Sequence, residues 1–164
     1  MNGTILLVED DANDVFFMMR SIKLAGMLNP VHVISDGRDA IHYLDGAGEY
    51  SDRAKYPLPC LVLLDLKLPH VMGLDVLKCI RQQSGLKTLI VIVFTSSTLP
   101  PDISQAYFLG ANSYLVKPSE PAALLRIVGV IKSYWLELNQ SAPALEYVEP
   151  PARPSRTTHQ DVSS

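Results

Sequence analysis

Apolar residues in this chain gather in five short runs, each followed by polar residues or a turn. The runs predict strands at residues 4–8, 31–34, 60–64, 89–94 and 113–116. The third run, CLVLL, is apolar at every position rather than at alternate ones, which is typical of a strand buried on both faces. Between the runs, apolar residues recur at helical spacing. The chain is therefore expected to alternate between strands and helices.

The helices are predicted from capping residues and from apolar side chains three or four positions apart. They are expected over about 12–25, 37–44, 73–83, 100–109 and 119–135. In the first helix, Met18 and Met19 are both expected to face inward, and Ser119 is expected to cap the last helix. Five strands that alternate with five helices predict an α/β fold with a doubly wound, mainly parallel five-stranded sheet.

Two stretches lie outside this alternation. Residues 45–59 form a polar connection with two glycines and two prolines, near the length of about 12–15 residues above which loops are usually functional or mobile. From about Asn139 the chain becomes rich in proline, serine and threonine, a composition that cannot build a core. We therefore expect one domain over residues 1–138 and a flexible or partner-docking tail over residues 139–164.

Composition narrows the function classes. A chain of 164 residues with a net charge of −3 and no basic stripe is not expected to bind nucleic acid. No apolar run approaches the length of about 18–20 residues that spans a bilayer, and the first run stops at Glu9, unlike a signal peptide. Cys60 and Cys79 form no CxxC motif and are expected to be buried free thiols. These features predict a cytoplasmic protein without membrane contact.

Polar side chains follow four of the predicted strands. They are the pair Glu9-Asp10, then Asp65, Thr95 and Lys117. Each has an ordinary structural explanation, because acids often cap helices and lysines are usually solvated. In a parallel sheet, however, the carboxyl ends of all strands lie along one edge, where open α/β sheets bind their ligands. We therefore expect three carboxylates, one hydroxyl and one ammonium group to meet in one cleft.

The charges in this cleft indicate a metal ion. Glu9, Asp10 and Asp65 would repel one another, and Lys117 offsets only one charge. A hard divalent cation relieves the remainder, and few carboxylates with retained waters favour Mg²⁺ over Ca²⁺. No cluster of histidines and cysteines suggests zinc, and of the scattered histidines only His70 lies near the cleft. A metal beside a nucleophilic carboxylate and a lysine is the equipment of phosphoryl transfer through an aspartyl phosphate.

Four motifs resemble the receiver domain of two-component response regulators, in the same order. They are LLVEDD at 6–11, LVLLDLKLP…G at 61–73, VFTSS at 93–97 and YLVKP at 114–118. The resemblance covers about residues 4–138 and implies a flavodoxin-like (CheY-like) fold. The loop at 45–59, the KLP after Asp65 and the lack of a fused output domain are most similar to stand-alone regulators associated with phytochrome kinases.

The resemblance also implies a role for each matching residue. Asp65 is expected to accept the phosphoryl group from a sensor histidine kinase, and Lys117 to bind it. Thr95 and Tyr114 correspond to the switch residues. The metal ligands implied are Glu9, Asp10, Asp65 and the Lys67 backbone carbonyl. The bond between Lys117 and Pro118 is usually cis in this family.

Two positions depart from the family in ways that concern dephosphorylation. Lys67 could shield the phosphoryl group from water, and Ser97 offers no amide or carboxylate to orient that water. We therefore expect slow dephosphorylation. The signal is expected to leave by contact with an unknown target protein, with a homodimer through the fourth helix, fifth strand and fifth helix as one form of that contact. Tyr134 and Trp135 would then belong either to a partner face or to the edge of the core.

Three other functions share parts of this pattern. A receiver fold that docks without cycling phosphate would not need the intact acids, Thr95 and Lys117. A metal-dependent aspartyl-phosphate phosphatase commonly has a second aspartate where this chain has Lys67. A flavodoxin-like FMN carrier needs a phosphate-binding loop after the first strand, where three acids would repel the phosphate.

Overall fold

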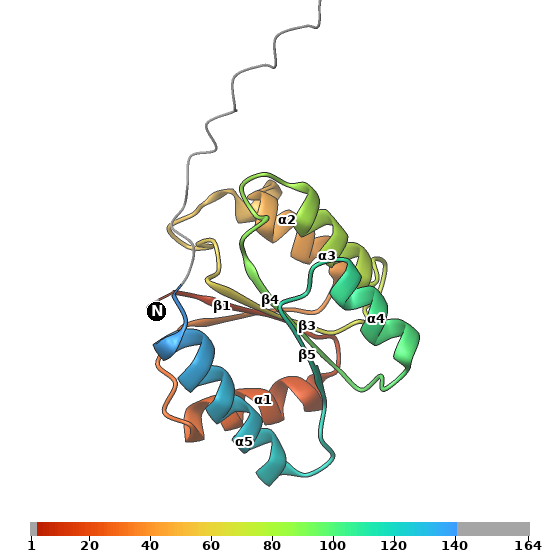
Figure 1. Cartoon of the computed structure of the whole chain (residues 1–164). Coiled ribbons are helices and arrows are strands. Elements are labelled where there is room, and N and C mark those ends of the chain that lie inside the picture. The colour runs from red at the N-terminus through yellow and green to blue at the C-terminus, as the bar shows by residue number, and fades with distance from the viewer. Residues whose placement is uncertain (1–2, 141–164) are drawn as a thin grey trace, which may run out of the picture.

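A computed structural model describes residues 3–140 as a five-stranded parallel sheet with helices on both faces (Figure 1). The strands are β1 (Ile5–Val8), β2 (Val31–Ile34), β3 (Leu61–Leu64), β4 (Ile90–Thr95) and β5 (Ser113–Val116). The main helices are α1 (Ala12–Leu24), α2 (Gly37–Asp45), α3 (Gly73–Gln82), α4 (Pro100–Phe108) and α5 (Pro121–Ile131). A 3₁₀ turn, η1 (Gly48–Ser51), follows α2, and a π-helical segment, η2 (Lys132–Leu138), continues α5. The predicted fold is confirmed.

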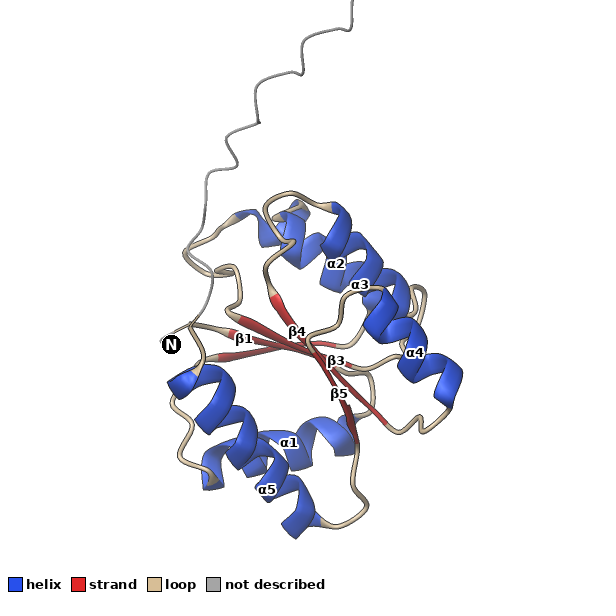
Figure 2. Cartoon of the chain, viewed as in Figure 1, coloured by secondary structure: helices blue, strands red, loops and turns tan. Residues whose placement is uncertain are grey.

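The strands lie in the order β2-β1-β3-β4-β5, and the three central strands are buried at every position. Alternate residues of each strand contact opposite layers. Leu61 and Leu63 of β3 pack with α1 and α5, whereas Val62 and Leu64 pack with α2 and α3. Figure 2 shows the same division, with α1 and α5 below the sheet and α2, α3 and α4 above it. The unbroken apolar run of β3 is explained by these two cores.

Two details of the helices differ from the sequence prediction. The N-cap of α5 is Glu120 rather than Ser119, and its side chain makes no capping hydrogen bond. Pro121 suits the first helical position, because its φ is fixed near the helical value and an N–H there would have no partner within the helix. Met19 is exposed, because neighbouring helical residues point about 100° apart and Met18 occupies the inward direction.

The connection between α2 and β3 is anchored by an aromatic cluster. His32, Tyr43, Tyr50 and Tyr56 stack edge to face or tilted, with ring centroids 5.1–6.0 Å apart. Arg53 donates to the carbonyls of Tyr43 and Leu44 at 2.7 Å, so it binds the C-terminal end of α2. These contacts hold the connection at the sheet edge near β2, away from the strand ends that carry the acids.

The predicted division between a domain and a tail stays a prediction. Residues 141–164, which make up most of that tail, lie outside the described residues. The two cysteines among the described residues, Cys60 and Cys79, are free thiols, but both are only half-buried. Within the part of the chain described, no helix has the length and apolar content that crossing a bilayer requires.

Candidate functional site

The candidate site lies at the carboxyl ends of the strands, where β1 and β3 are neighbours. The chain winds from β1 toward β2 on one side and from β3 toward β4 and β5 on the other. In open α/β sheets this switch point leaves a crevice outside the strand ends. Glu9 follows β1, Asp65 follows β3, Thr95 ends β4 and Lys117 follows β5. The topology thus brings residues more than 100 positions apart to one edge.

Lys117 holds this group together. Its Nζ atom lies 2.6 Å from Glu9 Oε2 and 2.7 Å from Asp65 Oδ2. It also lies 2.7 Å from Oδ2 of Asp14, in the first turn of α1. The side chains of Lys117, Glu9 and Asp65 are largely buried, with 12%, 3% and 7% of their surface exposed. One ammonium group therefore serves three carboxylates, of which those of Glu9 and Asp65 are buried and that of Asp14 is 44% exposed.

Asp14 is the site residue that the sequence analysis missed. Its position one turn after Asp11, on the helix that follows the acidic pair, was the available signal. Asp11 itself has a structural role, because its Oδ1 accepts hydrogen bonds from the N–H groups of Asn13 and Asp14 and so caps α1.

Asp65 is held through both carboxylate oxygens. Oδ1 accepts the N–H groups of Leu66 at 2.6 Å and Lys67 at 3.3 Å. Oδ2 accepts Lys117. The carboxylate therefore has a fixed orientation before any substrate arrives, which is what a nucleophile in a positioned reaction needs.

The acidic groups that were expected to hold a metal also converge. Oxygen atoms of Glu9, Asp10 and Asp65 lie within 4.8 Å of one another. Three hard oxygen donors of this kind suit a divalent cation that keeps several waters, such as Mg²⁺ or Mn²⁺. Asp10 is exposed to solvent, so the pocket is open on the side where those waters would lie.

Two of these groups, Glu9 and Lys117, have pKa values that differ from their ordinary ones. Burial raises the pKa of Glu9 from 4.5 to about 6, and repulsion from Asp65 adds to this, although Lys117 opposes both. Burial lowers the pKa of Lys117, but its hydrogen bonds to Asp14, Asp65 and Glu9 outweigh burial, so its pKa lies above the usual range. The lysine thus stays charged, whereas Glu9 is ionised at neutral pH against a cost.

Because Glu9 is ionised at a cost, the free energy of unfolding is expected to depend on pH. A carboxyl group with a raised pKa in the folded state favours folding at low pH and loses this contribution as pH rises through that pKa. For Glu9 the loss between about pH 4.5 and 7 is about 2 kcal/mol in the metal-free protein. We expect Glu9→Gln to have a higher free energy of unfolding than the wild type at pH 7, with the gap closing toward pH 5. Urea titrations in EDTA at both pH values measure this gap. A gap that does not depend on pH would contradict the shift.

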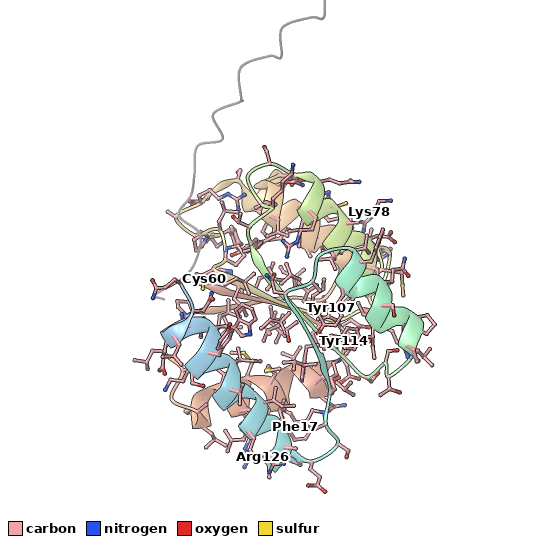
Figure 3. The ribbon with its side chains drawn as sticks, in the orientation of Figure 1. Phe17, Cys60, Lys78, Tyr107, Tyr114 and Arg126 are labelled. Atoms are coloured by element: carbon pink, nitrogen blue, oxygen red, sulfur yellow. The ribbon has the colours of Figure 1, made fainter. Side chains whose placement is uncertain are left out.

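Thr95 and Tyr114 meet at the loop between β4 and α4. Thr95 is fully buried, and its Oγ1 accepts the N–H of Ser97 at 3.5 Å. The Tyr114 hydroxyl donates to the Ser97 carbonyl at 3.0 Å, so it is not free at the surface. Figure 3 labels Tyr114 on β5 and Tyr107 on the neighbouring helix α4. The backbone of Ser97 thus links the two expected switch residues.

The two residues expected to tune dephosphorylation differ in exposure. Lys67 is exposed, two positions after Asp65. Ser97 is buried, and its hydroxyl donates a hydrogen bond of 2.5 Å to Oδ2 of Asp102, a residue of α4. The expected cis bond before Pro118 was wrong: no peptide bond within residues 3–140 is cis. This agrees with the general preference of X–Pro bonds for trans.

Both the sequence and the structure of this chain are similar to those of known proteins. Residues 5–129 match the model of the response regulator receiver domain family. The probable methanogenesis regulatory protein FilR2 of Methanothrix harundinacea is 39% identical over 84% of this chain and 86% of its own length. Response regulator Rcp1 of Synechocystis is 37% identical over 81% of this chain and 88% of its own length.

Solved structures of similar proteins have the same fold. The phosphorylated cyanobacterial phytochrome response regulator RcpA superposes with a TM-score of 0.81 at 31% identity, covering 87% of this chain and all of that one. The Mn²⁺-bound form of Rcp1 superposes with a TM-score of 0.78 at 35% identity, covering 86% of this chain and 99% of that one.

Proposed function

This chain belongs to the response regulator receiver domain family, and from this premise we propose that its Asp65 accepts a phosphoryl group from a sensor histidine kinase. The observation that carries the proposal is the geometry of Asp65. Its carboxylate ends the central strand, is held by two backbone N–H groups and lies 2.7 Å from the Lys117 ammonium. Receiver domains are not classical enzymes, and we propose that this one catalyses only its own phosphorylation and dephosphorylation.

The proposed transfer uses the groups already in place. An Asp65 carboxylate oxygen attacks the phosphorus of a phosphohistidine, the P–N bond breaks, and the imidazole keeps the electron pair and takes up a proton. Lys117 stabilises the charge on the phosphoryl oxygens. Receiver domains bind a divalent metal at this acidic site. Here we assign Mg²⁺ to Glu9, Asp10, Asp65 and the Lys67 carbonyl, where it would neutralise the same charge.

The direct test is phosphorylation by a small donor. Incubation of the full chain with acetyl phosphate should add one phosphoryl group by intact-protein mass spectrometry, and EDTA should prevent it. A chain that stays unmodified with Mg²⁺ present would favour the docking module that does not cycle phosphate. Turnover of an external phosphate ester would favour the phosphatase instead.

The kinase partner is proposed to be of the phytochrome type. Receiver domains of two-component systems interact with sensor histidine kinases, and RcpA is described as a phytochrome response regulator. The loop between α2 and β3 and the residues after Asp65 were the sequence features that suggested this class. Faster phosphotransfer from a phytochrome kinase than from an unrelated kinase would support the assignment, and equal rates would remove it.

Dephosphorylation is predicted to be slow, for two structural reasons. The exposed Lys67 can extend over the phosphoryl group, and the Ser97 hydroxyl is committed to Asp102 rather than to an attacking water. We expect Lys67→Asn to shorten the half-life of the phosphoprotein by roughly tenfold, less than the effect of about a hundredfold or more that is typical of one positioned acid–base group. Decay is measured after donor removal. A half-life equal to that of the wild type would contradict this role, and Lys78→Asn on α3 is the control.

The signal is proposed to leave through the outer surface of α4, β5 and α5. Thr95 would move toward the acyl phosphate and Tyr114 would follow, which changes this surface as a two-state unit. The surface carries exposed apolar side chains of α4, β5 and α5, and Figure 3 labels Tyr107 and Arg126 on it. Its most exposed members are Phe108 (89%) and Val130 (64%). Trp135 instead packs against the core, while Tyr134 remains half-exposed.

Such an apolar surface is suited to a second copy of the chain. We expect beryllofluoride, a phosphoryl mimic, to increase the dimer fraction of the wild type and not of Phe108→Asp. The matched control is Leu28→Asp, which alters an equally exposed apolar residue after α1. Sedimentation velocity measures the dimer fraction. Equal dimerisation of both variants would place the interface elsewhere, and no dimer in the wild type would leave a different target protein as the receiver of the signal.

A further inference from the structure

The loop between β3 and α3, residues 66–72, is held firmly at both ends. The Gly73 N–H donates to the Leu66 carbonyl at 2.9 Å, and the side chains of Leu66 and Leu68 are buried. A Cβ atom on Gly73 would lie 2.0 Å from the Asp65 carbonyl oxygen, so only glycine permits this close return. Lys67 lies between these anchors, exposed and directly beside the acceptor.

A third anchor holds the middle of the loop. His70 has a φ of 60°, the left-handed region that is uncommon for residues other than glycine. Its Nδ1 atom bonds to Oδ2 of Asp36, the N-cap residue of α2. Asp36 is mostly buried, and its other oxygen accepts the N–H groups of Arg38 and Asp39. One carboxylate therefore both caps α2 and fixes the loop.

The backbones of the loop and α2 also touch at this point. The Gly37 N–H approaches the Pro69 carbonyl at 3.4 Å. A Cβ atom on Gly37 would lie 1.9 Å from the Val71 carbonyl oxygen. Left-handed backbone at a non-glycine residue persists where the surroundings determine it. Here the surroundings are the start of α2, which lies on the far side of the loop from Asp65.

We propose that His70 and Asp36 are a positioning pair, which holds loop 66–72 against α2 and thereby keeps Lys67 in place beside Asp65 for metal binding. This inference rests on the proposed function, because it concerns the Lys67 carbonyl assigned to the metal. Neither residue touches the reacting atoms. Their effect passes through the loop backbone, whose Lys67 N–H already bonds to Asp65.

The test compares three full-length variants. His70→Gly keeps the left-handed backbone accessible but removes the side chain. His70→Asn also tolerates that backbone and restores a donor toward Asp36. His42→Ala is the control, because His42 faces Asp39 at 3.8 Å on exposed α2 surface, a comparable pair that does not contact the loop.

Two readouts separate positioning from stability. In metal-free protein, amide hydrogen exchange of residues 67–72 should speed up in His70→Gly and not in the control, while amides of α3 stay unchanged. The dissociation constant for Mg²⁺, measured by calorimetry, should rise roughly tenfold. Loss of a residue that supports a metal ligand typically weakens metal binding by about 10–100-fold, and the smaller effect is expected here because His70 is exposed. His70→Asn should recover most of both effects, with the free energy of unfolding nearly constant.

Other results would overturn the inference. If His70→Gly matches the wild type in exchange and Mg²⁺ affinity, the pair does not position the loop. The same holds if the control changes both readouts equally, or if α3 exchanges faster together with the loop. If instead the variants behave as expected but Asp65 takes up no phosphoryl group, the positioning pair stands and the proposed function fails.

Discussion

Replacing Asp65 with asparagine is expected to abolish Mg²⁺-dependent labelling by acetyl phosphate or by a phosphorylated kinase. The amide lacks the negative oxygen that attacks phosphorus, yet it has nearly the shape of the carboxylate. It can still accept the N–H groups of Leu66 and Lys67 through its oxygen. The expected loss is at least a thousandfold in rate, because the covalent step itself is removed. Intact-protein mass spectrometry over time measures it.

The fold of this variant should remain intact. The wild-type pocket holds Glu9, Asp14 and Asp65 around one ammonium group, so removal of one charge relieves repulsion. We expect a free energy of unfolding equal to or above that of the wild type at pH 7. Asp14→Asn is the control: it also removes a Lys117 partner but should keep substantial labelling. Labelling of Asp65→Asn at the wild-type rate would move the acceptor to another residue.

Replacing Lys117 with alanine is expected to damage both chemistry and stability. The ammonium lies within 2.7 Å of three carboxylates, two of which are almost fully buried. Leaving buried charges without a partner typically costs about 3–5 kcal/mol. Phosphorylation should slow by roughly a hundredfold or more, because the charge on the phosphoryl oxygens loses its fixed cation.

The loss of stability in Lys117→Ala should depend on pH and on metal. Without the ammonium, protonation of Glu9, whose pKa is already raised, becomes more favourable, so the loss should be largest near pH 8 and shrink toward pH 5. Millimolar Mg²⁺ should restore part of it by supplying another cation. Lys132→Ala, which removes a bond to the Ala25 carbonyl far from the pocket, should show neither dependence. A Lys117→Ala protein as stable as the wild type at pH 8 would contradict the assigned role of this lysine in the pocket.

Local sequence patterns were sufficient for the fold and for most of the site. Continuous apolar runs predicted β3 and β4, because strands buried on both faces have no polar positions. Because parallel strands end at one edge of a sheet, the positions of Glu9, Asp65 and Lys117 after three of these strands predicted that the three residues meet. The roles of Thr95 and Tyr114 came from family resemblance instead, since an isolated hydroxyl or phenol carries no pattern of its own.

Contacts between distant segments were not predictable in the same way. Asp14 looked like an ordinary first-turn acid, and only the path of β5 brings Lys117 to it. His70 and Asp36 are 34 residues apart and join two segments whose close approach depends on the glycine at position 37.

Two helix details were predicted wrongly for other reasons. Met18 and Met19 are adjacent on α1, so helix geometry lets only one of them face the core. The cap of α5 differs by one residue at a helix end, where sequence patterns are least precise.

The central claim, that the phosphoryl group resides on Asp65, is tested most directly by borohydride reduction of the phosphorylated wild type. Borohydride converts an aspartyl phosphate to homoserine, and tandem mass spectrometry then locates the altered residue. The account predicts homoserine at position 65 alone, and only when both donor and Mg²⁺ were present. Homoserine at position 10 or 14, or a phosphoryl group that survives on a serine, threonine or histidine with residue 65 unchanged, would contradict it.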